Sequence, residues 1–126
     1  MTRLTIALFS LLALPAAALA QQAGDAAKGE KVFAQCKACH EAEKGVNKVG
    51  PTLKGMIGRN VASVPDYKYS TAMLDYAKTH PVWTDELFLT YIENPKKEVP
   101  GTKMAFAGVK KPDDRANLLA YLKTKN

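Results

Sequence analysis

Apolar residues recur at helical spacing near both ends of the chain. Near the N-terminus, Asp25 is suited to cap a helix over residues 26–36, in which Gly29 and Phe33 fall on one face. Near the C-terminus, a proline suited to a first helical turn begins a pattern that predicts a helix over 112–123. The apolar face of this second helix consists of Leu118, Leu119 and Leu122.

Two shorter helices are predicted between these ends, over 71–77 and 85–93. Thr84 is suited to cap the second of them, because its hydroxyl can accept a hydrogen bond from the first turn. Trp83 and Phe88 lie on either side of this cap at the spacing of a hydrophobic staple. The hydrophobic pattern therefore predicts four helices.

Long stretches over 37–69 and 95–108 carry glycine and proline and show neither helical nor strand periodicity. A structureless loop of more than about 20 residues is unusual inside a compact domain. Such loops are compatible with a folded domain if they enclose a large ligand that replaces part of the core.

The motif Cys36-Lys37-Ala38-Cys39-His40 predicts such a ligand. Two cysteines at this spacing followed by histidine are the attachment pattern of c-type haem, with a thioether from each thiol and the histidine as an iron ligand. A thioredoxin-like pair would need a βαβ context, and a zinc site would need four ligands, with His80 far away. A structural disulfide would leave His40 unexplained.

The ligand on the other face of the iron decides between electron transfer and catalysis. The candidates are Met56, Met73, His80 and Met104. Methionine is most often core filler, and His80 lies in a turn before a proline. Met104 lies instead on a loop rich in proline and glycine that can pass across a ligand face. A thioether favours Fe(II), raises the haem potential and closes the sixth position.

Residues 1–20 have the features of a cleaved secretory signal. Arg3 provides a positive charge, residues 4–14 are almost wholly apolar, and Ala18-Leu19-Ala20 fits a cleavage site before Gln21. The apolar run is shorter than the roughly 20 residues needed to span a bilayer. We therefore expect a cleaved signal over 1–20, a single domain over 21–126, and export to the periplasm.

The predicted mature chain is basic. Without Arg3 it keeps 17 basic residues against 12 acidic ones, a formal charge of +5. The lysines are spread along the chain with no basic helix or RNA-binding signature, which disfavours nucleic acid as the partner. A field of this sign steers a soluble protein toward an acidic protein surface.

Several motifs together resemble the class I c-type cytochromes, most closely bacterial cytochrome c2 and mitochondrial cytochrome c. The similarity extends from Gly24 to about Lys123 and includes the haem-attachment motif and Gly58-Arg59. It also includes three longer runs: Gly50-Pro51-Thr52-Leu53-Lys54-Gly55, Tyr91-Ile92-Glu93-Asn94-Pro95-Lys96-Lys97 and Pro100-Gly101-Thr102-Lys103-Met104-Ala105-Phe106-Ala107-Gly108.

The resemblance implies an all-α cytochrome c fold whose terminal helices cross near Gly29 and Tyr121, with loops wrapped around one covalent haem. It implies that the Pro51 carbonyl orients His40 and that the Tyr91 hydroxyl approaches the Met104 sulfur. The positions that would surround the haem propionates are Arg59, Tyr69, Trp83 and Thr102. Phe106 would pack near the exposed haem edge.

The function implied is one-electron transfer, from a bc1-type complex to a reaction centre or terminal oxidase. Lysines around the haem edge would face the acidic partners. They are Lys31, Lys48, Lys96, Lys97, Lys103, Lys110 and Lys111. The alternatives are a haem enzyme, such as a peroxidase or nitrogen-oxide reductase, and a gas sensor, each of which needs an open iron position.

Overall fold

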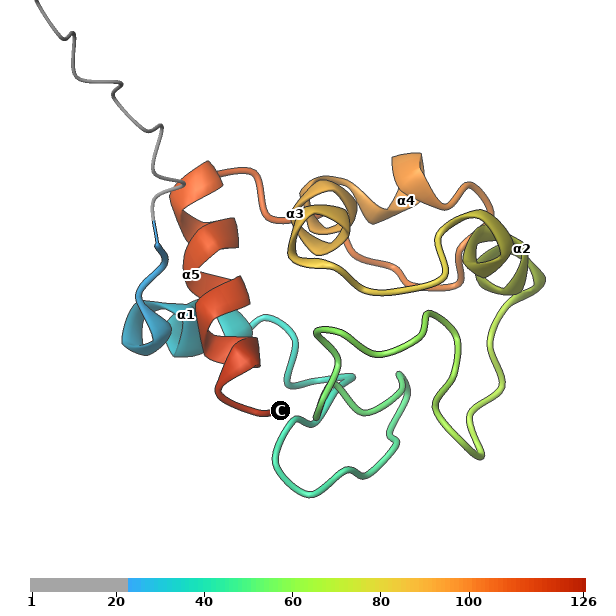
Figure 1. Ribbon diagram of the computed structural model, residues 1–126, viewed down its shortest axis with the longest axis horizontal. Helices are drawn as coiled ribbons and strands as arrows, with labels where there is room; N and C mark the ends of the chain where they lie inside the picture. Colours follow the sequence, from blue (N-terminus) through green and yellow to red (C-terminus); the bar gives the residue numbers. More distant parts are fainter. Residues whose placement is uncertain (1–22) are drawn as a thin grey trace, which may run out of the picture.

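The computed structural model describes residues 23–126, which fold into five helices joined by long irregular segments (Figure 1). The helices are α1 (Ala26–Phe33), α2 (Thr71–Thr79), α3 (Asp85–Glu93), α4 (Pro95–Glu98) and α5 (Pro112–Lys123). Within this range there is no strand, only an isolated bridge between Asn60 and Val82. The predicted all-α fold is confirmed. The predicted signal over 1–20 lies outside the described residues.

Helices α1 and α5 cross in close contact, although they lie at opposite ends of the chain (Figure 1). Gly29 is buried at the crossing, where a Cβ atom would lie 1.9 Å from the Asn117 carbonyl oxygen. Beside it, the rings of Phe33 and Tyr121 pack with their centroids 5.1 Å apart. Glycine at this position therefore lets the two backbones approach, which offsets its cost of about 1 kcal/mol inside a helix.

The predicted ends of two helices and one predicted loop were wrong. Helix α2 runs to Thr79, two residues beyond the predicted end at 77. Helix α1 ends at Phe33 rather than at Cys36, because the following amides bond three residues back, as in Cys36 N–H to Phe33 carbonyl at 2.8 Å. Pro95 ends α3 as expected but also begins α4, which the sequence had assigned to a loop. Asn94 caps α4, because its side chain accepts a hydrogen bond from the Lys97 amide.

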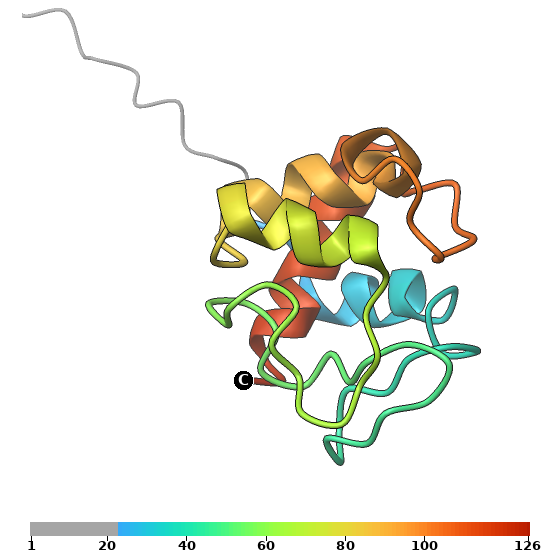
Figure 2. The ribbon, with the colours of Figure 1, turned by 90° about the vertical axis from the view of Figure 1, so that its right-hand side faces the viewer.

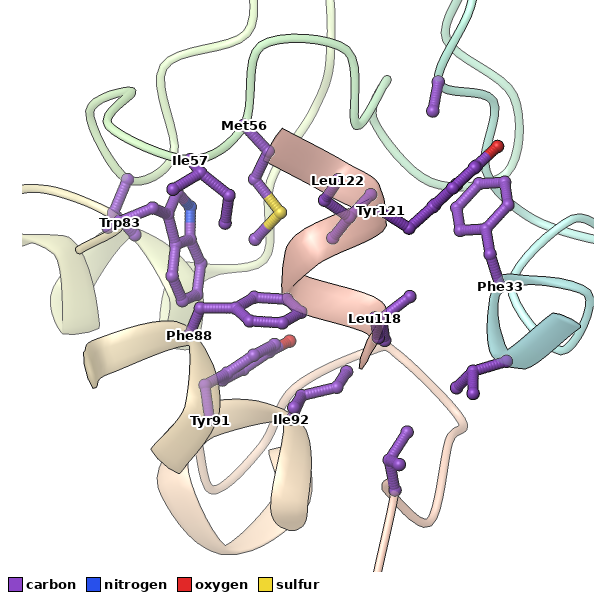
Figure 3. Close-up of a cluster of buried hydrophobic side chains, with 14 of the residues drawn as sticks. Phe33, Met56, Ile57, Trp83, Phe88, Tyr91, Ile92, Leu118, Tyr121 and Leu122 are labelled. Atoms are coloured by element: carbon purple, nitrogen blue, oxygen red, sulfur yellow. The ribbon is translucent and has the colours of Figure 1, made fainter. Parts of the chain in front are cut away.

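The hydrophobic core joins α5 to α3 (Figure 3). Leu118 and Leu122 of α5 and Phe88 of α3 are among the most deeply buried side chains. Thr84 caps α3 by accepting from the Leu87 amide at 3.1 Å, as predicted. Burying a large apolar side chain of this kind stabilises the fold by about 1.5–3 kcal/mol.

The irregular stretch between α1 and α2 occupies the opposite side of the molecule from α2 and α3 (Figure 2). Single backbone hydrogen bonds hold it there, including Gly58 N–H to Trp83 carbonyl at 2.8 Å and Gly55 N–H to Lys125 carbonyl at 2.9 Å. These bonds connect the loop to the start of α3 and to the C-terminus. No helix within residues 23–126 combines the length and apolar character needed to cross a bilayer.

We expect Gly29→Ala to destabilise the protein by about 2 kcal/mol or more, because overpacking forces α1 and α5 apart. Chemical denaturation of the purified protein measures the change. The control is Glu30→Ala, which alters the neighbouring exposed position on α1. Equal stabilities of the Gly29 and Glu30 variants would contradict the close-contact explanation.

Candidate haem site

A cavity of about 540 Å³ lies between the irregular loops and helices α2 and α3. Its walls are mainly apolar and include every residue that the sequence assigned to the haem site. Those residues are Cys36, Cys39, His40, Pro51, Arg59, Tyr69, Trp83, Tyr91, Thr102, Met104 and Phe106. These residues are up to 70 positions apart in the chain. The fold therefore brings to one cavity the residues that the sequence assigned to the haem site. Their individual roles remain predictions.

The two cysteines lie on the wall that follows α1. Both are free thiols rather than partners in a disulfide, with Cys36 half-buried and Cys39 exposed. Burial, with a smaller contribution from nearby Cys39, raises the pKa of Cys36 to about 11. Before haem is attached, the Cys36 thiol is therefore protonated at neutral pH and is a poor participant in disulfide exchange.

His40 is held by the segment that contains Gly50 and Pro51. Its Nδ1 donates to the Pro51 carbonyl oxygen at 2.8 Å, which leaves Nε2 free as a metal ligand. Burial lowers the pKa of His40, and the Lys48 charge acts in the same direction, against the opposing hydrogen bond to Pro51. The imidazole is therefore neutral at pH 7, the form that binds iron.

Gly50 lies directly against the His40 ring. A Cβ atom at this position would lie 2.2 Å from His40 Cε1. The Gly50 amide donates to the Cys39 carbonyl at 2.8 Å, which fixes this segment against the attachment motif. In the sequence Gly50 is only part of a family motif, and its role is not evident there because the contact with His40 depends on the fold.

Met104 reaches the same cavity from the loop between α4 and α5. The Tyr91 hydroxyl donates to the Met104 sulfur at 3.9 Å, and the Thr102 hydroxyl accepts from the Met104 amide at 3.2 Å. Burial raises the pKa of Tyr91, so its hydroxyl keeps the proton that it donates. The Tyr91 ring also packs edge-on against Trp83, with centroids 4.9 Å apart.

Arg59 presents an unpaired charge to the cavity. Its terminal nitrogens donate to the carbonyl oxygens of Lys54 and Thr52 at 3.0 and 3.1 Å, but its buried Nε has no partner. Within residues 23–126, Arg59 forms no ion pair. Burial lowers its pKa, which Tyr69 partly opposes. A buried cation of this kind fits an anionic group on the ligand, such as a haem carboxylate.

The other candidate ligands occupy different surroundings. Met56 and Met73 line the cavity, and Met56 is also packed into the core. His80 is not among the cavity residues; its ring stacks on Tyr76 with centroids 4.0 Å apart. Among the described residues, no group of three or more His, Cys, Asp and Glu side chains is arranged to hold a metal ion.

Comparisons with known proteins agree with this geometry. The sequence model of the Cytochrome c family matches residues 26–126. The chain belongs to the cytochrome c family. It is 49% identical to cytochrome c2 of Agrobacterium tumefaciens (strain II Chrys) over 79% of this chain and 90% of that protein. It is 46% identical to cytochrome c2 of Blastochloris viridis over 100% of this chain and 95% of that protein.

A solved structure supports the same assignment. Cytochrome cH from Methylobacterium extorquens superposes with a TM-score of 0.74 and is 46% identical, covering 81% of this chain and all of that one. Cytochromes c are electron-transfer proteins, and this chain is an electron carrier. With its attachment motif at Cys36, Cys39 and His40, it carries one covalent haem c. The cavity and the orphaned Arg59 nitrogen fit that group.

We expect Gly50→Ala to push the His40 ring away from the Pro51 carbonyl and weaken its donation to the iron. The reduction potential and the electronic spectrum of the holoprotein should both shift. Val46→Ala, at an exposed position of the same loop that does not line the cavity, serves as the control and should leave both unchanged. A Gly50→Ala protein with the parent spectrum and potential would show that the ring tolerates the added methyl group.

Proposed function

We propose that the protein is a periplasmic one-electron carrier whose haem iron is held by His40 and Met104. The observation that carries the proposal is the convergence of these two side chains, each oriented by a hydrogen bond, on the cavity that also contains Cys36 and Cys39. When bound, haem c supplies an iron that accepts and releases one electron. The imidazole and thioether would remain bound in both oxidation states.

The walls of the cavity favour electron transfer over catalysis. As the second iron ligand, Met104 would fill the position that oxygen or peroxide needs, and its thioether would stabilise the reduced iron. Among the described residues that line the cavity, His40 is the one histidine and there is no Asp or Glu. The lining therefore offers no carboxylate or second imidazole as a proton relay.

We expect Met104→Ala to open the iron, lower the reduction potential and allow the ferrous protein to bind carbon monoxide at neutral pH. The parent protein should bind carbon monoxide poorly, because Met104 blocks the sixth position. Absorption spectra and potentiometry measure these changes. Met73→Leu is the control, since Met73 lines the same cavity but is assigned to packing. Ready binding by the parent would reject Met104 as the ligand.

We propose that redox partners dock where the cavity reaches the surface. The exposed cavity residues there are Gln35, Cys39, Val49, Lys103 and Ala105. The predicted docking lysines are all exposed, and none takes part in the ion pairs of the described residues. Their charges are therefore available to an acidic partner surface, such as a bc1-type donor and a reaction centre or oxidase as acceptor.

We expect replacement of Lys96 and Lys97 by Gln to slow electron transfer to an acidic partner about fivefold at low ionic strength, because steering weakens. The difference should shrink as salt is added, since the Debye length falls to about 8 Å near 0.15 M. Stopped-flow kinetics across a salt series measures the effect. The control replaces Lys28 and Lys44, which are exposed but outside the docking set. If both proteins were slowed equally, the effect would come from net charge alone and not from the position of Lys96 and Lys97.

We also propose that residues 1–20 are a signal and that 21–126 form the mature single domain. The match to Blastochloris viridis cytochrome c2 runs over the whole chain and supports a shared N-terminal segment. Export would place both cysteines where haem is attached outside the cytoplasm. Mass measurement of the periplasmic protein tests this boundary, and a mature chain that still contains Arg3 would refute it.

A further inference from the structure

His80 is the second of the chain's two histidines and lies outside the haem cavity. It caps the C-terminus of α2, where its amide donates to the Tyr76 carbonyl at 3.0 Å. Its Nδ1 lies 3.2 Å from the same carbonyl and 3.0 Å from the Thr79 hydroxyl. These contacts hold the imidazole flat on the Tyr76 ring, with centroids 4.0 Å apart and planes at 14°. The half-buried imidazole therefore covers one face of that ring.

Tyr76 connects this stack to the core. Among the described residues of α2 it is the one that is buried, with 8% of its surface exposed. Burial raises the pKa of Tyr76 to about 12, and the nearby Glu98 carboxylate acts in the same direction, so the hydroxyl stays neutral. That hydroxyl is buried without a hydrogen-bond partner among the described residues. Tyr76 therefore acts on its surroundings through the packing of its ring.

The Tyr91 ring is held by two aromatic neighbours from different segments. Trp83, just before α3, packs edge-on against it with centroids 4.9 Å apart. Tyr76 of α2 packs against it at 6.5 Å with planes at 41°, within the range of favourable aromatic pairs. The Tyr91 hydroxyl donates to the Met104 sulfur at 3.9 Å. Because a thioether sulfur is a weak acceptor, this hydrogen bond depends on how the ring is oriented.

The rings of His80, Tyr76 and Tyr91, which we call the aromatic row, thus connect the surface to the sulfur of Met104. We propose that His80 is a positioning residue that acts through the Tyr76 ring on the hydrogen bond from Tyr91 to Met104, and so on the reduction potential. A hydrogen bond to the sulfur draws electron density from it, which disfavours Fe(III) and raises the potential. This inference rests on the proposed function, in which Met104 is the ligand.

Potentiometry of the holoprotein tests the aromatic row. We expect His80→Ala to shift the Fe(III)-to-Fe(II) ratio about threefold toward Fe(III) at a fixed applied potential, a fall of roughly 30 mV at 59 mV per tenfold change. His80→Phe restores a flat ring without a titratable nitrogen and should return the potential to that of the parent. If His80→Phe behaves as His80→Ala does, stacking is not the cause and the proposal is rejected.

Leu74→Ala is the matched control for His80→Ala. Leu74 is an apolar residue of the same helix that is 47% exposed and does not line the cavity. Its truncation removes surface contacts of α2 but leaves the aromatic row intact, so the parent potential should be kept. An equal fall of the potential in the two variants would reject the proposal, because any truncation on α2 would then suffice.

Variants of Tyr76 separate positioning from general loosening of the fold. Tyr76→Leu removes the ring against Tyr91 and should lower the potential at least as far as His80→Ala. Tyr76→Phe loses only the unpartnered hydroxyl and should keep the parent potential. Tyr121→Leu is the control, since Tyr121 is 6% exposed and packs at the α1–α5 crossing without lining the cavity. It should lose stability but keep the potential; an equal fall in Tyr76→Leu and Tyr121→Leu would reject the row.

Tyr91→Phe removes only the hydroxyl that contacts Met104. It should lower the potential by itself, and His80→Ala should then add little, because both changes act on one hydrogen bond. A full additional fall in the double variant would reject the proposal. If Met104→Ala leaves the potential and the carbon monoxide binding of the parent unchanged, the ligand assignment itself fails. If Met104→Ala opens the iron but His80→Ala keeps the parent potential, the row is rejected and the ligand stands.

Discussion

The close crossing of α1 and α5 at Gly29 is the contact on which the rest of the structure depends. It fixes the direction in which the chain leaves α1, and therefore where Cys36, Cys39 and His40 begin the cavity wall. It also presents Leu118 and Leu122 of α5 to α3, whose Tyr91 lies opposite that wall and contacts Met104. Gly29, by allowing α1 and α5 to pack closely, thus sets the position of one cavity wall relative to the other.

The cavity explains how so small a domain tolerates so much irregular backbone. Within residues 23–126, the stretch between α1 and α2 contains no helix or strand. Isolated backbone hydrogen bonds connect it to other parts of the chain. When bound, haem c would supply apolar surface for these loops and so replace part of the missing core. The covalent bonds through Cys36 and Cys39 would keep this part of the core in place in both oxidation states.

Positively charged side chains lie both inside the haem cavity and on the surface around it. Inside, Arg59 is half-buried with no anion beside it among the described residues, and its buried Nε has no partner, an arrangement that is costly unless the bound group provides one. Outside, the lysines proposed for docking are uncompensated, whereas Lys123 and Lys125 are paired with Asp85 and Glu43. Among the described residues, the proposed docking lysines are therefore outside ion pairs, whereas these two lysines near the end of α5 are in them. Lys103 differs from the other docking lysines because it also contacts Tyr67.

The sequence alone determined the covalent attachment, because Cys36, Cys39 and His40 are adjacent and their chemistry is local. It also predicted the capped helices, since Thr84 and Pro112 act on the next few residues. It misplaced the end of α1 and missed α4, where tighter turns and the Asn94 cap compete with the periodic pattern. The contact of Tyr91 with Met104 was implied by the family resemblance, not by the pattern of residues. Only the tertiary structure placed Gly50 against His40 and Tyr67 beneath Lys103. These contacts join different segments of the chain, and their positions depend on how α1 and α5 pack. The periodicity and spacing of residues in the sequence do not reveal that packing.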